Sequence, residues 1–149
     1  MIPAICGVLG VLAMFRVRFA YVLFCVVGLA YFPAKVGFAV TPQSCEWLFG
    51  WDLALHSFRN YGHIMLFAMF YVMTRRQFTK PGWKTEVFSL LLCLTMGALV
   101  EAAQALSGVG HCRTRDLIPD TVGALIGMGG LGLAGKLRGT LMRKASTPA

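Results

Sequence analysis

The chain has 149 residues, of which 57% are hydrophobic and only 13% are charged, whereas soluble domains carry about 25% charged residues. A mean hydropathy of +0.68 leaves too much apolar surface for one small core, so the composition predicts an integral membrane protein with a single all-α domain. The formal net charge of +8 does not indicate nucleic-acid binding, because Lys and Arg cluster between apolar segments rather than on a soluble basic face with interleaved aromatics.

The first fifteen residues are apolar but short for a membrane span. No positive charge precedes them, so residues 1–15 make a poor signal peptide, and we expect an apolar N-terminal extension that is interfacial or partly inserted. An alternative start at Met14 would place Arg16 and Arg18 at the beginning of the protein, directly before the first span.

Four longer apolar segments follow, each near the ~20 residues that cross a bilayer. We predict spans at 19–38, 53–74, 86–107 and 117–135, which make a polytopic bundle of four transmembrane helices over residues 17–135. Residues 136–149 then form a basic cytoplasmic tail.

The basic residues between these segments predict the orientation. Three clusters precede the first span, fill the loop between the second and third, and follow the fourth; they contain Arg16, Arg18, Arg75, Arg76, Lys80, Lys84, Lys136, Arg138, Arg143 and Lys144. The positive-inside rule places these clusters and both termini in the cytoplasm, in a multi-pass protein of the plasma membrane. Arg113 and Arg115, on the predicted outer side, are the exception, and Glu46 reads as a solvated outer-loop charge.

The second span carries a polar stripe. Asp52, His56 and Asn60 recur every four residues, with Arg59 and His63 beside them, so on a helix they would face the bundle interior. In the alternative, Asp52 and Arg59 are interfacial anchors that reach up to water.

In the third span, Glu101 and Gln104 lie one helical turn apart near the outer end. A carboxyl group at this depth must be protonated, paired or metal-bound, and by depth its expected partner is His56 or Arg59. The alternative is a buried Glu that only bonds neighbouring helices together.

The segment before the fourth span is also polar. Arg113 and Arg115 could grip a phosphate or carboxylate bidentately, or could be solvated loop charges. Asp116 complements the positive end of the helix dipole, whereas Asp120 lies one turn further in and is not explained as a cap. Gly123 and Gly127 form a small-xxx-small motif that we expect to seat this helix against the polar stripe.

The five cysteines have no metal-binding spacing, and we expect no metal and no cofactor. Cys6, Cys25 and Cys93 fall in apolar segments and are expected to be inert. Cys45 and Cys112 fall in the two predicted outer loops, where an oxidising compartment would allow a disulfide between them.

Taken in order, these motifs resemble the VanZ-like family of small bacterial membrane proteins. The similar features are Asp-x-x-x-His (Asp52, His56), Glu-x-x-Gln (Glu101, Gln104) and the spaced residues Asp116, Asp120, Gly123 and Gly127. There are two departures: Gly110 stands where the family usually has Arg, and Asp120 where it usually has Asn. The resemblance implies a role at the cell envelope in the inner membrane and an association with teicoplanin resistance, without an established reaction.

We therefore expect a protein that binds an anionic lipid or envelope precursor in an outer-facing polar pocket. The pocket would be formed by Asp52, His56, Arg59, Asn60, Glu101, Gln104, Arg113, Arg115, Asp116 and Asp120. The alternatives are an enzyme of lipid-linked phosphate or ester chemistry, with His56 or His63 as base and Asp52 or Glu101 as candidate carboxylate, and a small transporter. Homo-oligomerisation is left open.

Overall fold

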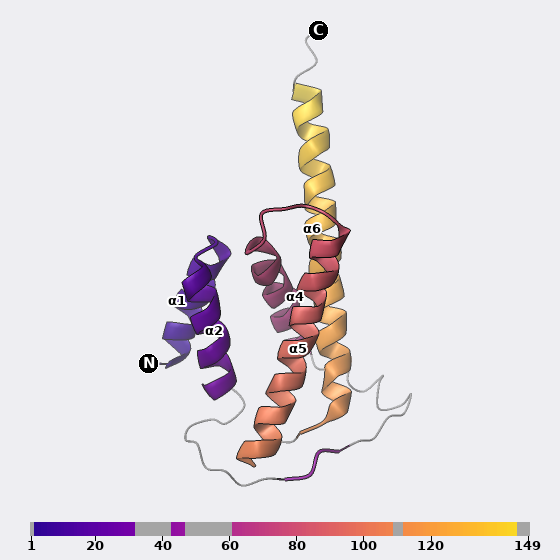
Figure 1. Cartoon of the computed structure of the whole chain (residues 1–149). Helices are drawn as coiled ribbons and strands as arrows, with labels where there is room; N and C mark the ends of the chain where they lie inside the picture. Colours follow the sequence, from indigo (N-terminus) through magenta and orange to yellow (C-terminus); the bar gives the residue numbers. More distant parts are fainter. Residues whose placement is uncertain (1, 32–42, 47–60, 109–111, 146–149) are drawn as a thin grey trace.

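The computed structural model describes residues 2–31, 43–46, 61–108 and 112–145. Within these ranges the chain is all-helical (Figure 1), with helices α1 (Ile2–Met14), α2 (Arg18–Tyr31), α4 (Tyr61–Arg76), α5 (Trp83–Ser107) and α6 (Leu117–Ala145) and a short 3-10 turn, η1 (Thr114–Asp116). The only extended pairing in the described part is an isolated bridge between Glu46 and Arg113. The predicted all-α class is confirmed.

Helix α6 packs most extensively against α4, and glycines make this close approach feasible. A Cβ atom at Gly123 would run into the carbonyl oxygen of Ile64, and one at Gly127 would lie 2.5 Å from the carbonyl oxygen of Ala68. The small-xxx-small spacing of the two glycines thus sets the contact of α6 with α4. The segment that precedes α4 carries the predicted polar stripe.

Helices α1 and α2 form a tight hairpin. Helix α1 ends in a Schellman motif: Val17 N–H donates to Leu12 O and Arg16 N–H to Ala13 O, with Arg16 in the left-handed region at φ 66°. Gln77 and Arg76, just after and at the end of α4, donate to the carbonyls of Ala13 and Met14. The N-terminal extension is therefore a packed helix of the bundle.

The helices bury a small core and leave many apolar side chains outside. Tyr71, Cys93 and Ala124 lie at the centre of the packing, whereas Phe15 and Phe19 are 75% and 77% exposed. Two helical segments, Trp83–Ser107 and Thr114–Arg143, are long and apolar enough to cross a membrane. Helices α2 and α4, as described, are shorter than the predicted spans 19–38 and 53–74, so the four-span arrangement stays a prediction.

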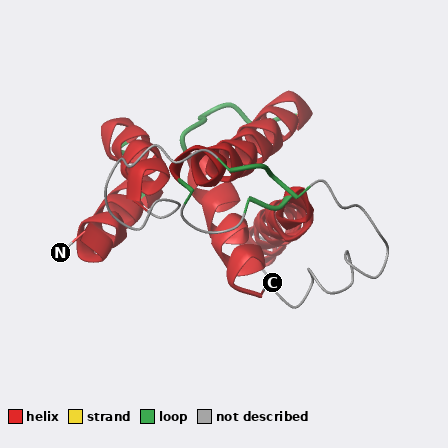
Figure 2. Cartoon of the chain, turned by 90° about the horizontal axis from the view of Figure 1, so that it is seen from below, coloured by secondary structure: helices red, strands yellow, loops and turns green. Residues whose placement is uncertain are grey.

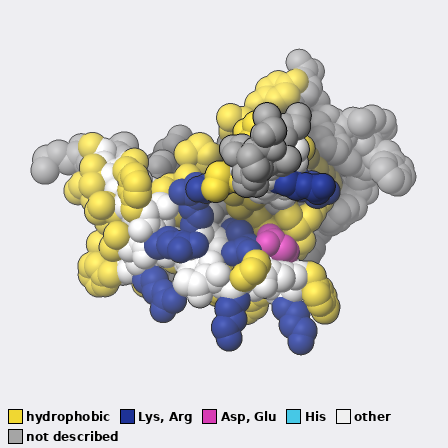
Figure 3. All heavy atoms as spheres, turned by 90° about the horizontal axis from the view of Figure 1, so that it is seen from above, with side chains coloured by type: hydrophobic (Ala, Val, Ile, Leu, Met, Phe, Trp, Pro, Cys, Tyr) yellow, Lys and Arg dark blue, Asp and Glu magenta, His cyan; other side chains and the backbone are white. Residues whose placement is uncertain are grey.

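The two ends of the bundle differ in charge. The α1–α2 turn, the 77–82 turn and the late part of α6 share one end, the upper end in Figure 1, which we call the basic end. Viewed from above, Lys and Arg side chains spread across it (Figure 3). The residues concerned are Arg16, Arg18, Arg75, Arg76, Lys80 and Lys84.

Helix α1 departs from the expected topology. It runs toward the basic end, so its first residues lie about 20 Å from that end at 1.5 Å per residue (Figure 1). The predicted grouping of both termini on one side therefore does not extend to the beginning of α1. The predicted grouping applies to the start of α2 and to the C-terminal end of α6.

Candidate functional site

The opposite end of the bundle, viewed in Figure 2, is organised by a disulfide between Cys45 and Cys112, whose Cα atoms are 4.7 Å apart. These are the two cysteines that the sequence analysis placed in outer loops. Around the disulfide, Glu46 N–H donates to Cys112 O, and Thr114 donates to Glu46 O through both its N–H and its hydroxyl. Gln43 N–H donates to Ala105 O. Segment 43–46 is thereby fastened to the end of α5 and to the residues that precede η1.

Glu101 lies beneath this fastened loop and is only 5% exposed. Its Oε2 accepts a 2.7 Å hydrogen bond from the backbone N–H of Arg113, while its Oε1 is buried without a partner in the described residues. The side-chain oxygen of Gln104, one turn further along α5, is buried and unpartnered in the same way. Two hydrogen-bond acceptors therefore lie unused side by side along the helix.

The backbone at the end of α5 exposes its carbonyls to this region. Gly108 ends the helix at φ 63°, a left-handed conformation that glycine adopts without steric cost, and its N–H donates to Gln104 O. The side-chain amide of Gln43 donates to the same carbonyl at 3.3 Å.

Asp120 is the second buried carboxyl group, at 1% exposure. Its Oδ1 lies 2.8 Å from Nδ1 of His63 on α4, which is a charge-assisted hydrogen bond when the imidazole is protonated. Its Oδ2 faces Gly97 on α5, where a Cβ atom would lie 2.8 Å from that oxygen. Gly97 thus leaves room for the carboxyl group between the helices.

These groups form one electrostatic cluster. Glu101 interacts with Asp116, Asp120 and His63, and His63 interacts in turn with all three acidic residues. We call His63, Glu101, Gln104, Asp116 and Asp120 the polar centre. Among the described residues, it holds three acidic side chains within electrostatic range of one histidine, and Asp120 is the one hydrogen-bonded to it.

The two arginines beside the polar centre are held differently. Arg113 Nε lies 3.4 Å from Glu46 Oε2, an ion pair at the rim, although Nε lacks a well-aligned hydrogen bond. Arg115 is half-buried, and its guanidinium makes no hydrogen bond or ion pair with another described residue. The Glu46 side chain is 51% exposed, as expected for a solvated loop charge, and its carboxylate also pairs with Arg113.

The structure thus brings together Glu101, Gln104, Asp116 and Asp120, with Arg113 bonded to Glu101 through its backbone. The remaining predicted ligand residues, Asp52, His56, Arg59 and Asn60, lie outside the described residues. The described partner of Glu101 is the backbone N–H of Arg113, and the expected pairing with His56 or Arg59 stays a prediction.

His63 and Glu46 are contributors that were not among the expected ligand residues. The stripe spacing predicts that His63 lies beside the site. Its pairing with Asp120 depends on the register between α4 and α6, which the spacing does not determine. In the described part, no three His, Cys, Asp or Glu side chains are grouped as a metal ion would require.

The polar centre uses the same spaced acidic and glycine positions that carried the family resemblance. The sequence pattern that defines the VanZ/LLP1 family matches residues 19–135. The chain belongs to the VanZ/LLP1 family. No curated protein and no solved structure matches the chain. The family match includes the whole polar centre of this VanZ/LLP1 protein and leaves α1 and the last part of α6 outside it.

Proposed function

We propose that this VanZ/LLP1 protein spans the inner membrane of a bacterium and binds an anionic lipid or a lipid-linked envelope precursor at the polar centre. The observation that carries the proposal is a pair of buried acceptor oxygens, on Glu101 and Gln104, that have no hydrogen-bond partner among the described residues. A buried acceptor without a partner costs about 1–3 kcal/mol, so a ligand that supplies hydroxyl or amide donors would recover that free energy.

The charge around these acceptors suits a headgroup that also carries an anion. Arg115 has no partner in the described part, and a guanidinium can hold a phosphate or carboxylate bidentately. Asp116 and Asp120 would limit the positive charge at the site, so that an anion with donor groups is preferred over a bare anion. Residues 52–60 would complete the pocket from the second predicted span, with Asp52, His56, Arg59 and Asn60.

The apolar exterior supports a ligand that arrives through the bilayer. Large apolar side chains are exposed along α5 and α6, among them Leu91, Leu99, Ile126 and Leu133. Lipid tails would cover these side chains, and a lipid-linked ligand would reach the polar centre from the outer leaflet. Family membership supports a link to glycopeptide resistance of the teicoplanin type, which such binding to envelope precursors would explain.

Native mass spectrometry of the detergent-purified protein tests this proposal by measuring which membrane lipids remain bound. We expect Glu101→Gln and Arg115→Gln to reduce the co-purified anionic lipid about tenfold, since each removes one charge-assisted contact. In a glycopeptide-sensitive bacterial host, the same variants should lose any teicoplanin tolerance that the wild-type protein confers.

Glu86→Gln is the matched control for this experiment, because it makes the same substitution on the same helix at the opposite end. Glu86 pairs with Arg75 and Tyr71, far along α5 from the polar centre. If Glu101→Gln and Glu86→Gln lower lipid binding equally, general destabilisation explains the loss and the proposed site is wrong.

One observation favours an enzyme as the second candidate. The bond between His63 and Asp120 has the geometry of a general base oriented by a carboxylate. In this alternative His63 would activate water or a hydroxyl group toward a lipid-linked phosphate or ester. Hydrolysis of such a lipid that disappears in His63→Gln while lipid binding persists would favour catalysis over binding alone.

A further inference from the structure

A second feature, at the other end of the bundle, is independent of the polar centre. An apolar groove of about 350 Å³ runs between α1 and α4, with Phe24 of α2 also lining it. On the α1 side of the groove, Gly7 and Gly10 have no side chains that would fill it. On the α4 side, Met69 and Met73 line it. Nothing lies within 4 Å of a Cβ atom placed at Gly7, so this part of the groove is open.

The groove ends at two arginines. Met14 lines both the groove and an adjoining pocket of about 370 Å³, which Phe15, Arg16 and Arg76 complete. Arg76 lies three residues beyond Met73 on α4, so it follows the apolar wall by about one helical turn. The apolar floor therefore passes directly into a basic mouth, formed by Arg16 and Arg76.

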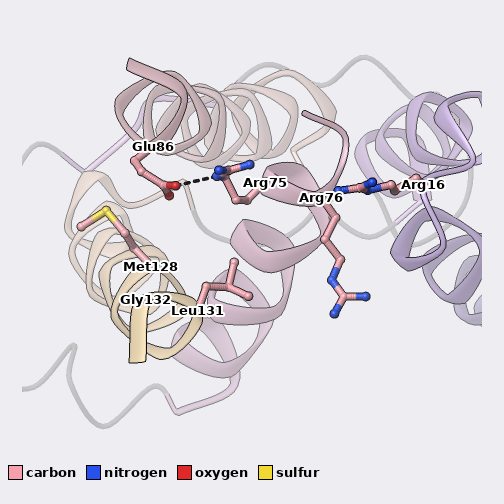
Figure 4. Close-up of a pocket in the computed structure, with 7 residues that line it drawn as sticks. All are labelled: Arg16, Arg75, Arg76, Glu86, Met128, Leu131 and Gly132. Carbon is pink, nitrogen blue, oxygen red and sulfur yellow. Dashed lines mark hydrogen bonds and ion pairs between the residues drawn. The ribbon is translucent and has the colours of Figure 1, made fainter. Parts of the chain in front are cut away.

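The charge of this basic mouth is not neutralised by its surroundings. A neighbouring pocket of about 460 Å³ contains Arg16, Arg76, Arg75 and Glu86 (Figure 4). Arg75 turns toward Glu86, with Nε 2.6 Å from Oε1. The Arg76 side chain donates one hydrogen bond to the carbonyl of Met14, and the guanidinium of Arg16 makes no hydrogen bond or ion pair with another described residue. Both side chains are exposed.

The backbone at Arg16 gives a further reason to look for a ligand. Arg16 occupies the left-handed position of the Schellman motif, at φ 66°, where glycine is the usual residue. An L-residue in this conformation is strained, and such strain concentrates at sites where the side chain has a task. Here the Arg16 side chain lines the pocket that adjoins the groove at Met14.

We infer that this groove binds one anionic phospholipid, with its phosphate held by Arg16 and Arg76 and one acyl chain lying between α1 and α4. The charge of the mouth selects a negative headgroup, and the apolar groove continuous with it selects a chain. Since the basic end is predicted to face the cytoplasm, the lipid would come from the inner leaflet, where anionic lipids attract basic residues at the membrane surface.

The experiment uses the full chain in nanodiscs of dioleoyl phosphatidylcholine, with dioleoyl phosphatidylglycerol added and bound lipids counted by native mass spectrometry. We expect the wild type to prefer phosphatidylglycerol over phosphatidylcholine about tenfold. Arg16→Gly should abolish this preference without loss of thermal stability, because glycine relieves the left-handed backbone.

Two further variants distinguish binding of the lipid headgroup from binding of the acyl chain. Gly7→Leu fills the groove and should weaken both lipids alike, whereas Lys80→Gln, a matched loss of charge outside the mouth, should change neither. Glu101→Gln, in the polar centre, should also leave the preference intact, so failure here is distinguishable from failure of the proposed function.

The inference is overturned if the wild type binds both lipids equally, or if Arg16→Gly behaves like Lys80→Gln. Inorganic phosphate at millimolar concentration tests whether the two arginines bind a soluble phosphate compound instead of a lipid headgroup. If phosphate displaces phosphatidylglycerol and Gly7→Leu has no effect, the mouth binds a soluble phosphate compound and the lipid assignment is wrong.

Discussion

Asp120 and Glu101 are both buried, yet their carboxyl groups are stabilised in different ways. Asp120 is paired with the side chain of His63, whereas Glu101 accepts one backbone N–H and leaves its second oxygen unused. Removing the partner of a buried charge costs far more free energy than breaking an ion pair at the surface. We therefore interpret Asp120 as the structural anchor of the polar centre and Glu101 as its ligand-facing group.

A double-mutant cycle tests the anchor. His63→Gln and Asp120→Asn should each lower the free energy of unfolding by about 1–3 kcal/mol, and the double variant should lose less than the sum, because both changes remove the same bond. Denaturant unfolding in mixed micelles measures all three. Glu86→Gln, at the opposite end of α5 and paired with Arg75, is the control and should combine additively with His63→Gln. Additivity of the His63 and Asp120 variants within about 0.5 kcal/mol would contradict the anchor role.

At this scale the sequence identified Glu101 and Asp120 because acidic residues stand out in apolar segments. It could not identify their partners. His63 meets Asp120 through the register between α4 and α6, and Arg113 meets Glu46 because the disulfide brings two distant loops together. Both depend on tertiary contacts that residue spacing does not determine.

Among the helices, α6 has two parts that differ in how closely they pack. Its first half presents Gly123 and Gly127 to α4, whereas Gly130 and Gly135 have nothing within 4 Å of a Cβ position. The helix also continues to Ala145, beyond the predicted span end at 135, because Leu137, Leu141 and their neighbours include no helix-breaking proline. The predicted basic tail is therefore helical over most of its length.

The same substitution at two glycines of α6 tests the packing. Gly127→Ala should destabilise the bundle by about 1–3 kcal/mol, because its Cβ would lie 2.5 Å from Ala68 O and the backbones must separate. Gly130→Ala should be neutral or stabilising by up to about 1 kcal/mol, from helix propensity alone. Unfolding of the two variants in the same micelles gives the comparison. Equal effects would mean that α4 and α6 do not approach as closely as described.

For the whole molecule, the two ends differ in both charge and covalent chemistry. Arginines and lysines collect at the basic end (Figure 3). The disulfide between Cys45 and Cys112 closes the opposite end. A disulfide persists on the oxidising side of a membrane, and Lys and Arg are retained on the cytoplasmic side. Two independent physical arguments therefore predict the same orientation of the bundle in a membrane.

This orientation predicts that position 80 is cytoplasmic and position 44 is external. In intact cells, a membrane-impermeant thiol reagent should label Ser44→Cys but should label Lys80→Cys only after lysis. Of the free cysteines, Cys6 and Cys93 are buried and Cys25 is partly buried, and the wild-type protein gives their background labelling. Reduction before alkylation should release thiols at Cys45 and Cys112 only from protein that has been inserted. Labelling of position 80 from outside would reverse the bundle, and the polar centre would then face the cytoplasm, where an outer-leaflet envelope precursor could not reach it.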